Sequence, residues 1–253
     1  MPRVLLRPLH RWFGGVGHVA AFMQDAVRAL RDVRTWPAQT GHQMRRIGSD
    51  SVPIAVFICG FTGIVLALQA SYTFTGAVPL YIVGTLVGKT IMLELGPVLT
   101  GLALAGRVGA NIAAELGTMR VTEQVDALET LAFDPPAYLV VPRVLAATVM
   151  FPFVVALATA TGLFTGYVTA VNLLDLSTVE FVRGLRLFYQ FKDIWYGLVK
   201  AMSFGLAIAI IGCYCGLGVR RGAAEVGAAT TRAVVRGSQA VIVLDAVWAV
   251  LLL

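Results

Sequence analysis

Four ionisable residues stand inside or at the edges of long apolar stretches of this sequence: Lys89, Glu94, Lys200 and Asp245. If such a stretch crosses a bilayer, a charge near its centre costs at least about 2.5–3.5 kcal/mol on insertion scales, so each side chain should face a partner or a wet cavity. Lys89 and Glu94 are five residues apart and point in different directions on one helix. We therefore expect partners from other helices, with Glu94–Lys200 as the favoured pair. The alternative for each lysine is that its stem carries the ammonium to the headgroups.

A second chemical candidate is the run 84–90, Gly-Thr-Leu-Val-Gly-Lys-Thr, which looks like a phosphate-binding loop. A P-loop needs four residues between its glycines and a strand before it, whereas this run has three and lies in an apolar stretch. It therefore predicts no nucleotide site, and active transport would need an ATPase on another chain. The glycines instead have the small-xxx-small spacing that lets helices approach closely. The same spacing recurs at Gly162 with Gly166 and at Gly212 with Gly216.

Metal, redox and hydrolytic chemistry find little support in the residue types. The three cysteines, Cys59, Cys213 and Cys215, all fall in apolar stretches, and the three histidines all precede residue 43. We expect the cysteines to be small buried apolar residues. No membrane-embedded His, paired Asp or Ser/Lys arrangement stands out. The sequence therefore predicts no catalytic residue, no metal site and no cofactor bound by this chain.

The elements that must position these residues follow from composition. Of 253 residues 58% are apolar and only 13% charged, against about 45–50% and about 25% in ordinary soluble domains. A bilayer span needs about 20 apolar residues, and long runs favour helices over a barrel. We predict an all-α integral membrane protein with five transmembrane helices, with a turn near Pro79. The expected spans are 51–71, 80–106, 144–172, 197–219 and 237–253.

The Lys and Arg distribution predicts the orientation of these spans. Segment 1–50 holds eight Arg and three Asp, and segment 220–236 holds four Arg and one Glu. Both segments are expected to be cytoplasmic under the positive-inside rule, segment 107–143 by parity, and the C-terminus periplasmic. The net charge of +6 is then a topology signal. Nucleic-acid binding would need a basic stripe with stacking aromatics, which the sequence lacks.

The region before the first span is expected to form an amphipathic helix. Its apolar residues recur at steps of four and three, its other face carries Arg, and Pro37 is expected to end it. The stripe consists of Trp12, Val16, Val19, Met23, Ala26, Leu30 and Val33. A helix of this type lies in the membrane interface or packs on a soluble partner, and we favour the interface. The chain thus divides into an interfacial region, 1–50, and a transmembrane domain, 51–253.

Segment 107–143 is expected to leave the membrane near Arg107, continue past Glu115 and form a short cytoplasmic helix. Thr122 can cap this helix with Glu123 in its first turn, and Pro135 and Pro136 stop it. One face would carry Val121, Val125 and Leu128, and another Glu123, Asp126 and Glu129. Such a helix could dock a motor domain or be a solvated connection, and the pattern alone does not separate these two.

Several motifs in this region resemble the MlaE/YrbE permease family, the membrane subunit of lipid-transporting ABC systems that work with MCE proteins. They are Glu-Leu-Gly-Pro at 94–97, Ala-Gly-Arg-x-Gly at 105–109, Ala-Glu-Leu-Gly-Thr-Met at 114–119, Thr-Glu-Gln-x-Asp-Ala-Leu-Glu at 122–129 and Val-Val-Pro-Arg at 140–143. Shorter matches at 63–69, 229–235 and 244–245 extend the resemblance over about residues 45–253. Where members of the family often carry a basic residue before Glu-Leu-Gly-Pro, this chain has Leu93, and Lys89 is the nearest possible replacement.

The resemblance implies a homodimeric permease in the bacterial inner membrane. ATPase subunits would bind ATP and Mg on the cytoplasmic side, MCE-domain proteins would sit outside, and a STAS-domain protein is an additional candidate partner. Phospholipid or a related lipid would pass through an apolar cavity at the dimer centre. The coupling helix of the family maps onto residues 122–131, and its intramembrane charges map onto Glu94, Lys200 and Asp245.

Three other functions compete with a lipid-transport permease. An ion-coupled secondary transporter could use Glu94 and Asp245 as ion sites, but the chain shows no inverted repeat, and five spans divide poorly into two halves. A membrane scaffold would leave the intramembrane charges as an unexplained cost. An intramembrane enzyme is the least favoured.

Overall fold

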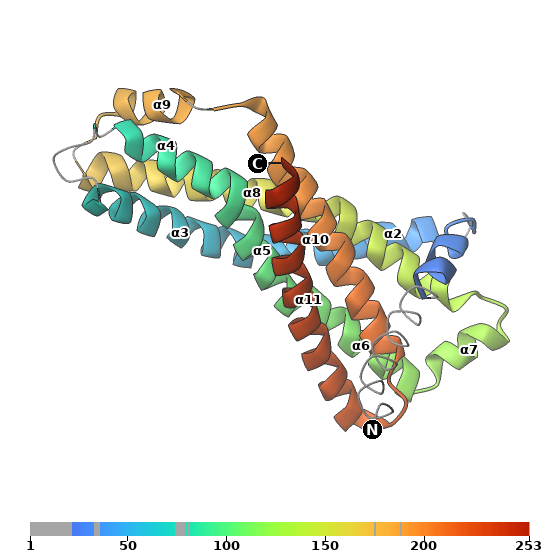
Figure 1. Cartoon of the computed structure of the whole chain (residues 1–253). Helices are drawn as coiled ribbons and strands as arrows, with labels where there is room; N and C mark the ends of the chain where they lie inside the picture. The colour runs from blue at the N-terminus through green and yellow to red at the C-terminus, as the bar shows by residue number, and fades with distance from the viewer. Residues whose placement is uncertain are drawn as a thin grey trace, which may run out of the picture.

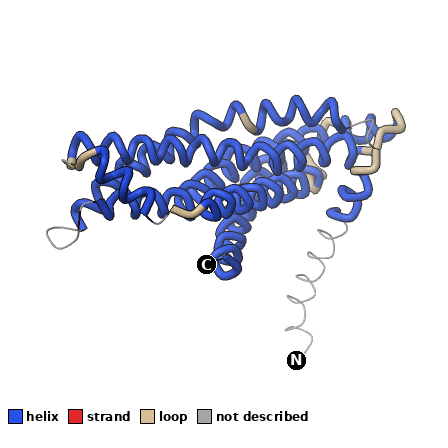
Figure 2. The backbone as a smooth tube through the Cα atoms, turned by 90° about the horizontal axis from the view of Figure 1, so that it is seen from above, coloured by secondary structure: helices blue, strands red, loops and turns tan. Residues whose placement is uncertain are grey.

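The computed structural model describes residues 22–32, 36–73, 79, 81–174, 176–187 and 189–252. Within these residues every regular element is a helix, as Figure 2 shows. The long elements are α3 (Val52–Thr73), α8 (Val141–Leu173), α10 (Phe191–Leu217) and α11 (Gly222–Leu252). The shorter α-helices are α2 (Trp36–Ile47), α4 (Tyr81–Thr90), α5 (Gly96–Leu104), α6 (Ala110–Val121), α7 (Gln124–Thr130) and α9 (Thr178–Leu187). A 3₁₀ turn, η1 (Ser49–Ser51), joins α2 to α3.

Five helical runs are long and apolar enough to cross a membrane, which confirms the all-α fold with five spans. They are Trp36–Thr73, Tyr81–Val121, Pro136–Leu173, Phe191–Leu217 and Gly222–Leu251. Most begin or end well beyond the predicted apolar limits; the last begins at Gly222 instead of residue 237. The reason is that helical hydrogen bonding continues past the hydrocarbon wherever polar residues can be solvated, so charge marks the membrane edge and not the helix end.

The run Tyr81–Val121 bends at two π-helical turns, η2 (Ile91–Leu95) and η3 (Ala105–Gly109). A third π-helical turn, η4 (Pro136–Val140), leads into α8. Pro97 follows η2 and has no N–H to donate to the carbonyl of Leu93, four residues earlier. Such turns are a known source of helix kinks. The run changes direction between α4 and α5, as Figure 1 shows.

The elements meet at two ends of the bundle (Figure 1). The α9 end, as we call it, gathers the C-termini of α3 and α8, the N-termini of α4 and α10, and α9 itself. The α7 end gathers α2, α7, the C-termini of α6 and α10, and the N-terminus of α11. Segments 107–143 and 220–236 thus lie at the same end of the bundle. This agrees with the prediction that both face the same side of the membrane.

Close helix contacts occur at the small residues predicted to allow them. A Cβ on Gly162 would lie 2.9 Å from the carbonyl oxygen of Cys59 in α3, and one on Gly216 would lie 2.9 Å from that of Ala113 in α6. On Gly84 a Cβ would collide with the backbone of Phe181 in α9. The run 84–90 is therefore a helix-packing surface of α4, which agrees with the prediction that it is not a phosphate-binding loop.

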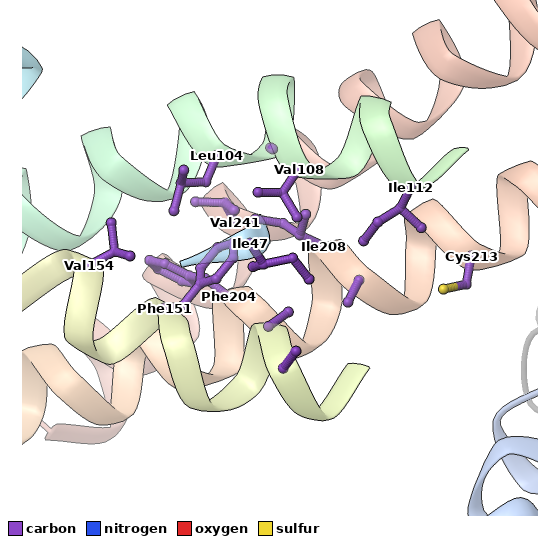
Figure 3. Close-up of a cluster of buried hydrophobic side chains, with 14 of the residues drawn as sticks. Ile47, Leu104, Val108, Ile112, Phe151, Val154, Phe204, Ile208, Cys213 and Val241 are labelled. Carbon is purple, nitrogen blue, oxygen red and sulfur yellow. The ribbon is translucent and has the colours of Figure 1, made fainter. Parts of the chain in front are cut away.

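The main core joins α5, α6, α8, α10 and α11 around Phe151 and Phe204, which are both fully buried (Figure 3). Leu104, Val108 and Ile208 belong to the same cluster, and Figure 3 labels these and several of its other members. The three cysteines are free and buried. This confirms their prediction as small apolar residues.

Most of the predicted amphipathic helix, including Trp12, Val16, Val19 and Val33, lies outside the described residues. Residues 22–29 are helical, and Met23 and Leu30 of the stripe are exposed. The prediction that Pro37 ends this helix is wrong. The helix ends before residue 33, and Pro37 lies in the first turn of α2, where a proline needs no hydrogen-bond acceptor.

Candidate transport site and coupling surface

Lys200 of α10 is the centre of a buried ionic cluster. Its side chain is fully buried, its Nζ donates to Oε2 of Glu94 at 2.7 Å, and the same Nζ lies 2.5 Å from Oδ1 of Asp245. The predicted Glu94–Lys200 pair is confirmed, with Asp245 as a second anion. Because the ammonium has no exposure, the snorkelling alternative is wrong for Lys200.

The cluster ties three spans together through one ammonium. Glu94 comes from η2, Lys200 from α10 and Asp245 from α11. Nζ of Lys200 also donates to the carbonyl of Leu93 at 3.2 Å, the oxygen to which Pro97, four residues later, can donate no N–H. All three donor sites of the ammonium thus have an oxygen nearby, as a buried cation requires.

Lys89 belongs to a different pair from the one around Lys200. Its Nζ lies 3.7 Å from Oδ2 of Asp193, and its side chain is 39% exposed. Asp193 also accepts the backbone N–H of Gln190 at 3.1 Å and closes a capping box at the start of α10. Sequence reasoning missed Asp193 because the expected span begins only at residue 197. The Gln-x-x-Asp spacing at 190–193 is a signal for an earlier helix start.

A cavity of about 760 Å³ opens beside these two pairs. Its wall combines four aromatic rings with charged, polar and apolar side chains from α4, η2, the start of α10 and α11. The lining residues are Lys89, Leu93, Gln190, Phe191, Lys192, Asp193, Trp195, Tyr196, Val199 and Trp248. Tyr196 separates the cavity from the cluster, since its ring centroid lies 4.9 Å from Nζ of Lys200. Trp248 donates from Nε1 to Ser203 Oγ at 2.9 Å, and Ser203 donates to the carbonyl of Lys200. The cavity wall and the ionic cluster are therefore one connected structure.

At the opposite end, α7 presents an acidic surface. Val125 is buried and Leu128 is half-buried against the core, while Glu123, Asp126 and Glu129 are exposed. The burial of Val125 and Leu128 and the exposure of the three acids agree with the predicted faces, but Val121 belongs to α6 and Glu123 precedes α7. Its predicted N-cap is wrong: Thr122 donates its hydroxyl back to the carbonyl of Thr118 at 2.9 Å and so ends α6. Glu123 takes the cap position with a left-handed φ of 59°, and α7 begins at Gln124.

Ion pairs hold α6 and α7 in place. Arg120 of α6 lies 2.6 Å from Asp126 of α7, and Glu115 of α6 pairs with Arg46 at 2.7 Å and with the buried Arg143 at 3.0 Å. Arg107 donates to Ser51 Oγ at 2.5 Å. The two residues predicted near the cytoplasmic end of this span, Arg107 and Glu115, thus link α6 and η3 to the α2–α3 and α8 segments. They lie far along the chain from the Lys200 cluster and do not join it.

Among the described residues, no three His, Cys, Asp or Glu side chains converge as a metal site would require. The arrangement can hold an amphiphile beside an internal charge cluster, and it can present a docking helix at the far end.

Comparison with known proteins matches this architecture. The family model Permease MlaE covers residues 40–251. A probable ABC transporter permease protein of Rickettsia felis is 42% identical over 223 residues, which are 88% of this chain and 86% of the relative. The probable ABC transporter permease protein slr1045 of Synechocystis is 41% identical over 81% of this chain and 78% of its own length. The chloroplastic protein TRIGALACTOSYLDIACYLGLYCEROL 1 of Arabidopsis thaliana is 31% identical over 88% of this chain and 63% of its own length. The chain therefore belongs to the MlaE permease family and is a multi-pass membrane subunit of an ABC transporter.

Proposed function

We propose that this permease moves phospholipid or a related lipid between the inner membrane and an MCE-protein channel, driven by separate ATPase subunits. Two copies would form the membrane core, with ATP and Mg on the partner chains and a STAS-domain protein as a further candidate partner. The observation that carries the proposal is the cavity of about 760 Å³ whose wall rests on the Lys200 cluster.

The cavity suits an amphiphile better than a small ion. Phe191, Trp195, Tyr196 and Trp248 give it apolar surface for a chain or glycerol backbone, and Lys89 offers a cation at its edge. Ligand sites of this size are typically apolar with a few placed polar groups. Leu93 stands where the family often has a basic residue, and it lines this cavity together with Lys89. Lys89 can therefore supply a cation to the same cavity.

The competing secondary-transport function places ion or proton binding on Glu94 and Asp245. Both carboxylates lie within 2.7 Å of one buried ammonium. A permanent internal cation occupies the position that a transported cation would need, so the geometry supports a structural or gating role for the two acids instead.

The acidic face of α7 supports ATPase docking. Glu123 and Glu129 point into open solvent, while Arg120 holds the helix through Asp126. With this end in the cytoplasm, the N-terminal region would be cytoplasmic and the C-terminus periplasmic. Single cysteines at Glu129 and Val179 test this orientation: an impermeant thiol reagent added outside spheroplasts should label only the second.

Transfer of a fluorescent phospholipid from proteoliposomes to an MCE acceptor tests the function. The assay needs the assembled permease–ATPase complex and ATP. Glu94→Gln should lower the ATP-dependent rate at least tenfold while the complex still assembles, because one anion of the cluster loses its charge. Glu180→Gln on α9 is the matched control and should transfer normally. ATP-independent transfer driven by an ion gradient would overturn the proposal in favour of secondary transport.

A further inference from the structure

A second hollow, of about 670 Å³, lies at the α7 end and outside the cavity described above. Its walls come from residues 22–25, the end of α10 and the first half of α11. The lining residues are Phe22, Asp25, Tyr214, Cys215, Leu217, Gly218, Arg220, Glu225, Arg232 and Arg236. No role assigned so far uses this hollow.

Three arginines face two acids in this hollow, and both acids are already engaged. Glu225 accepts the backbone N–H groups of Arg220 and Arg221 at 3.0 and 2.6 Å, and so caps the start of α11. Asp25 pairs with Arg28 on its own helix at 3.8 Å. Within the described part of the chain, neither Arg232 nor Arg236 has a carboxylate at ion-pair distance. Arg236 contacts the Cys215 side chain and Arg232 lies within electrostatic range of Glu225, but neither guanidinium is neutralised by an ion pair within these described residues.

Arg232 and Arg236 are four residues apart on α11, so they lie on the same helix face one turn apart. Two stacked guanidinium groups can each donate paired hydrogen bonds to one phosphate. Phe22 and Tyr214 form an aromatic wall next to them, with ring centroids 5.8 Å apart. This combination of cationic and apolar surface fits an amphiphile with an anionic headgroup and an apolar chain.

Arg236 marks the point along α11 where a charged segment gives way to a mostly apolar one. Gly237 directly follows Arg236 and packs near Ala105 and Ile208 of the core, where a Cβ would lie 3.5 Å from Ala105 Cβ. After Gly237, α11 is mostly apolar, with Ser238, Gln239 and Asp245 as its polar residues, and before it lie the arginines and the α10–α11 turn. Basic pockets between helices at such a boundary are suited to anionic headgroups.

We propose that the Arg220–Arg232–Arg236 hollow binds the phosphate of an anionic phospholipid in the leaflet at the α7 end. The site is separate from the transport cavity, and its occupancy does not depend on ATP. A lipid phosphate and free inorganic phosphate share this chemistry, and the apolar wall favours the lipid.

Titration of the purified full-length chain in a neutral detergent tests the proposal, with dihexanoyl phosphatidylglycerol and inorganic phosphate as separate probes. Arg232→Gln with Arg236→Gln should weaken phosphatidylglycerol binding by about tenfold or more, since two charge-assisted contacts are lost. Arg232→Lys with Arg236→Lys should weaken it less, because charge remains without the paired donors. Arg183→Gln with Arg186→Gln on α9 removes the same charge elsewhere and should leave binding unchanged.

Equal affinity of the glutamine variant and the unaltered chain would overturn the proposal. Binding of inorganic phosphate but not of the lipid would keep a phosphate site and overturn the lipid as its source. Loss of a second copy or of the ATPase from the Arg232→Gln/Arg236→Gln complex, with lipid binding intact, would assign the arginines to a protein interface and also overturn it. None of these results depends on lipid transfer, so the proposed function stands or fails independently.

Discussion

Around Lys200, two carboxylates from different spans converge on one ammonium that has no exposure, whereas Glu123 and Glu129, beside and on α7, are exposed to solvent and form no ion pair with the described part of the chain. The first arrangement neutralises charge internally, because an unpaired ion in a low-dielectric interior is very costly. The second leaves charge available to another molecule. The comparison shows that the same residue types hold spans together in the Lys200 cluster and leave charge exposed to solvent at the α7 end.

The sharpest way to break this contrast is to remove the shared cation. Lys200→Met leaves Glu94 and Asp245, whose side chains are 35% and 25% exposed, without their shared counter-ion. Breaking a fully buried pair costs about 3–5 kcal/mol, and we expect a cost below that limit here. We expect a large loss of folded protein and a lower thermal midpoint in detergent. Lys192→Met, at an exposed neighbouring lysine, should change neither quantity. Adding Glu94→Gln and Asp245→Asn to Lys200→Met should recover part of the loss, and a failure to recover any would point to packing as the cause.

The α7 surface should respond in the opposite manner, with binding lost and folding kept. Glu123→Lys with Asp126→Lys should reduce co-purified ATPase at least tenfold, because like charges replace the offered anions, while the thermal midpoint falls only slightly. Stoichiometric ATPase on this variant would refute the docking role.

Asp126 also anchors α7 through Arg120, so a second variant is needed to separate docking charge from helix placement. Glu123→Lys with Glu129→Lys leaves the Arg120–Asp126 pair intact. ATPase loss from both double variants supports docking through charge. Loss from the first alone assigns the effect to the position of α7.

Glu115 allows exposed and buried ion pairs to be compared at a single carboxylate, because it pairs with one exposed and one buried arginine. The Arg46 side chain is 45% exposed and that of Arg143 only 4%. Arg46→Met should cost at most about 1 kcal/mol, as exposed pairs do. Arg143→Met should cost more, about 1–3 kcal/mol, because Arg143 also donates to the carbonyl of Leu139. Equilibrium unfolding in mixed micelles measures both, and equal costs would mean that burial does not set the strength of these pairs.

The five spans, the Glu94–Lys200 pair and the two faces of α7 could be predicted because each depends on local composition or on a cost that only pairing relieves. Long apolar runs predict membrane spans. A carboxylate such as Glu94 within a span is costly unless a cation compensates its charge. These inferences need no knowledge of how the helices pack.

The partners that sequence reasoning missed depend on backbone geometry. Pro97 and η2 turn the carbonyl of Leu93 toward Lys200, and nothing in residue spacing shows that a π-helical turn will form there. Asp193 became a partner of Lys89 because α10 begins at Phe191, several residues before its apolar core. Thr122 was assigned to the wrong helix because its hydroxyl can serve either the end of α6 or the start of α7, and only the left-handed Glu123 decides between them.

The smallest expected effect concerns a carboxylate outside the membrane, on α9. Glu180 accepts the hydroxyl and the backbone N–H of Ser177 at 2.8 and 3.0 Å, and these hydrogen bonds lower the pKa of Glu180 below its usual 4.5. Because the pKa is lowered in the folded state, the ionised Glu180 carboxylate stabilises the start of α9. This stabilisation is complete above the unfolded-state pKa and is lost as the pH falls through the folded-state pKa. Amide exchange in the first turn of α9 should therefore become faster below about pH 4.5 in the unaltered chain. In Glu180→Gln it should show no such step, because no ionised group is present at that position. A step of equal size in both chains would mean that charges elsewhere control the opening of α9. The exposed Glu180 carboxylate would then contribute nothing to local stability, in contrast to the carboxylates paired with Lys200.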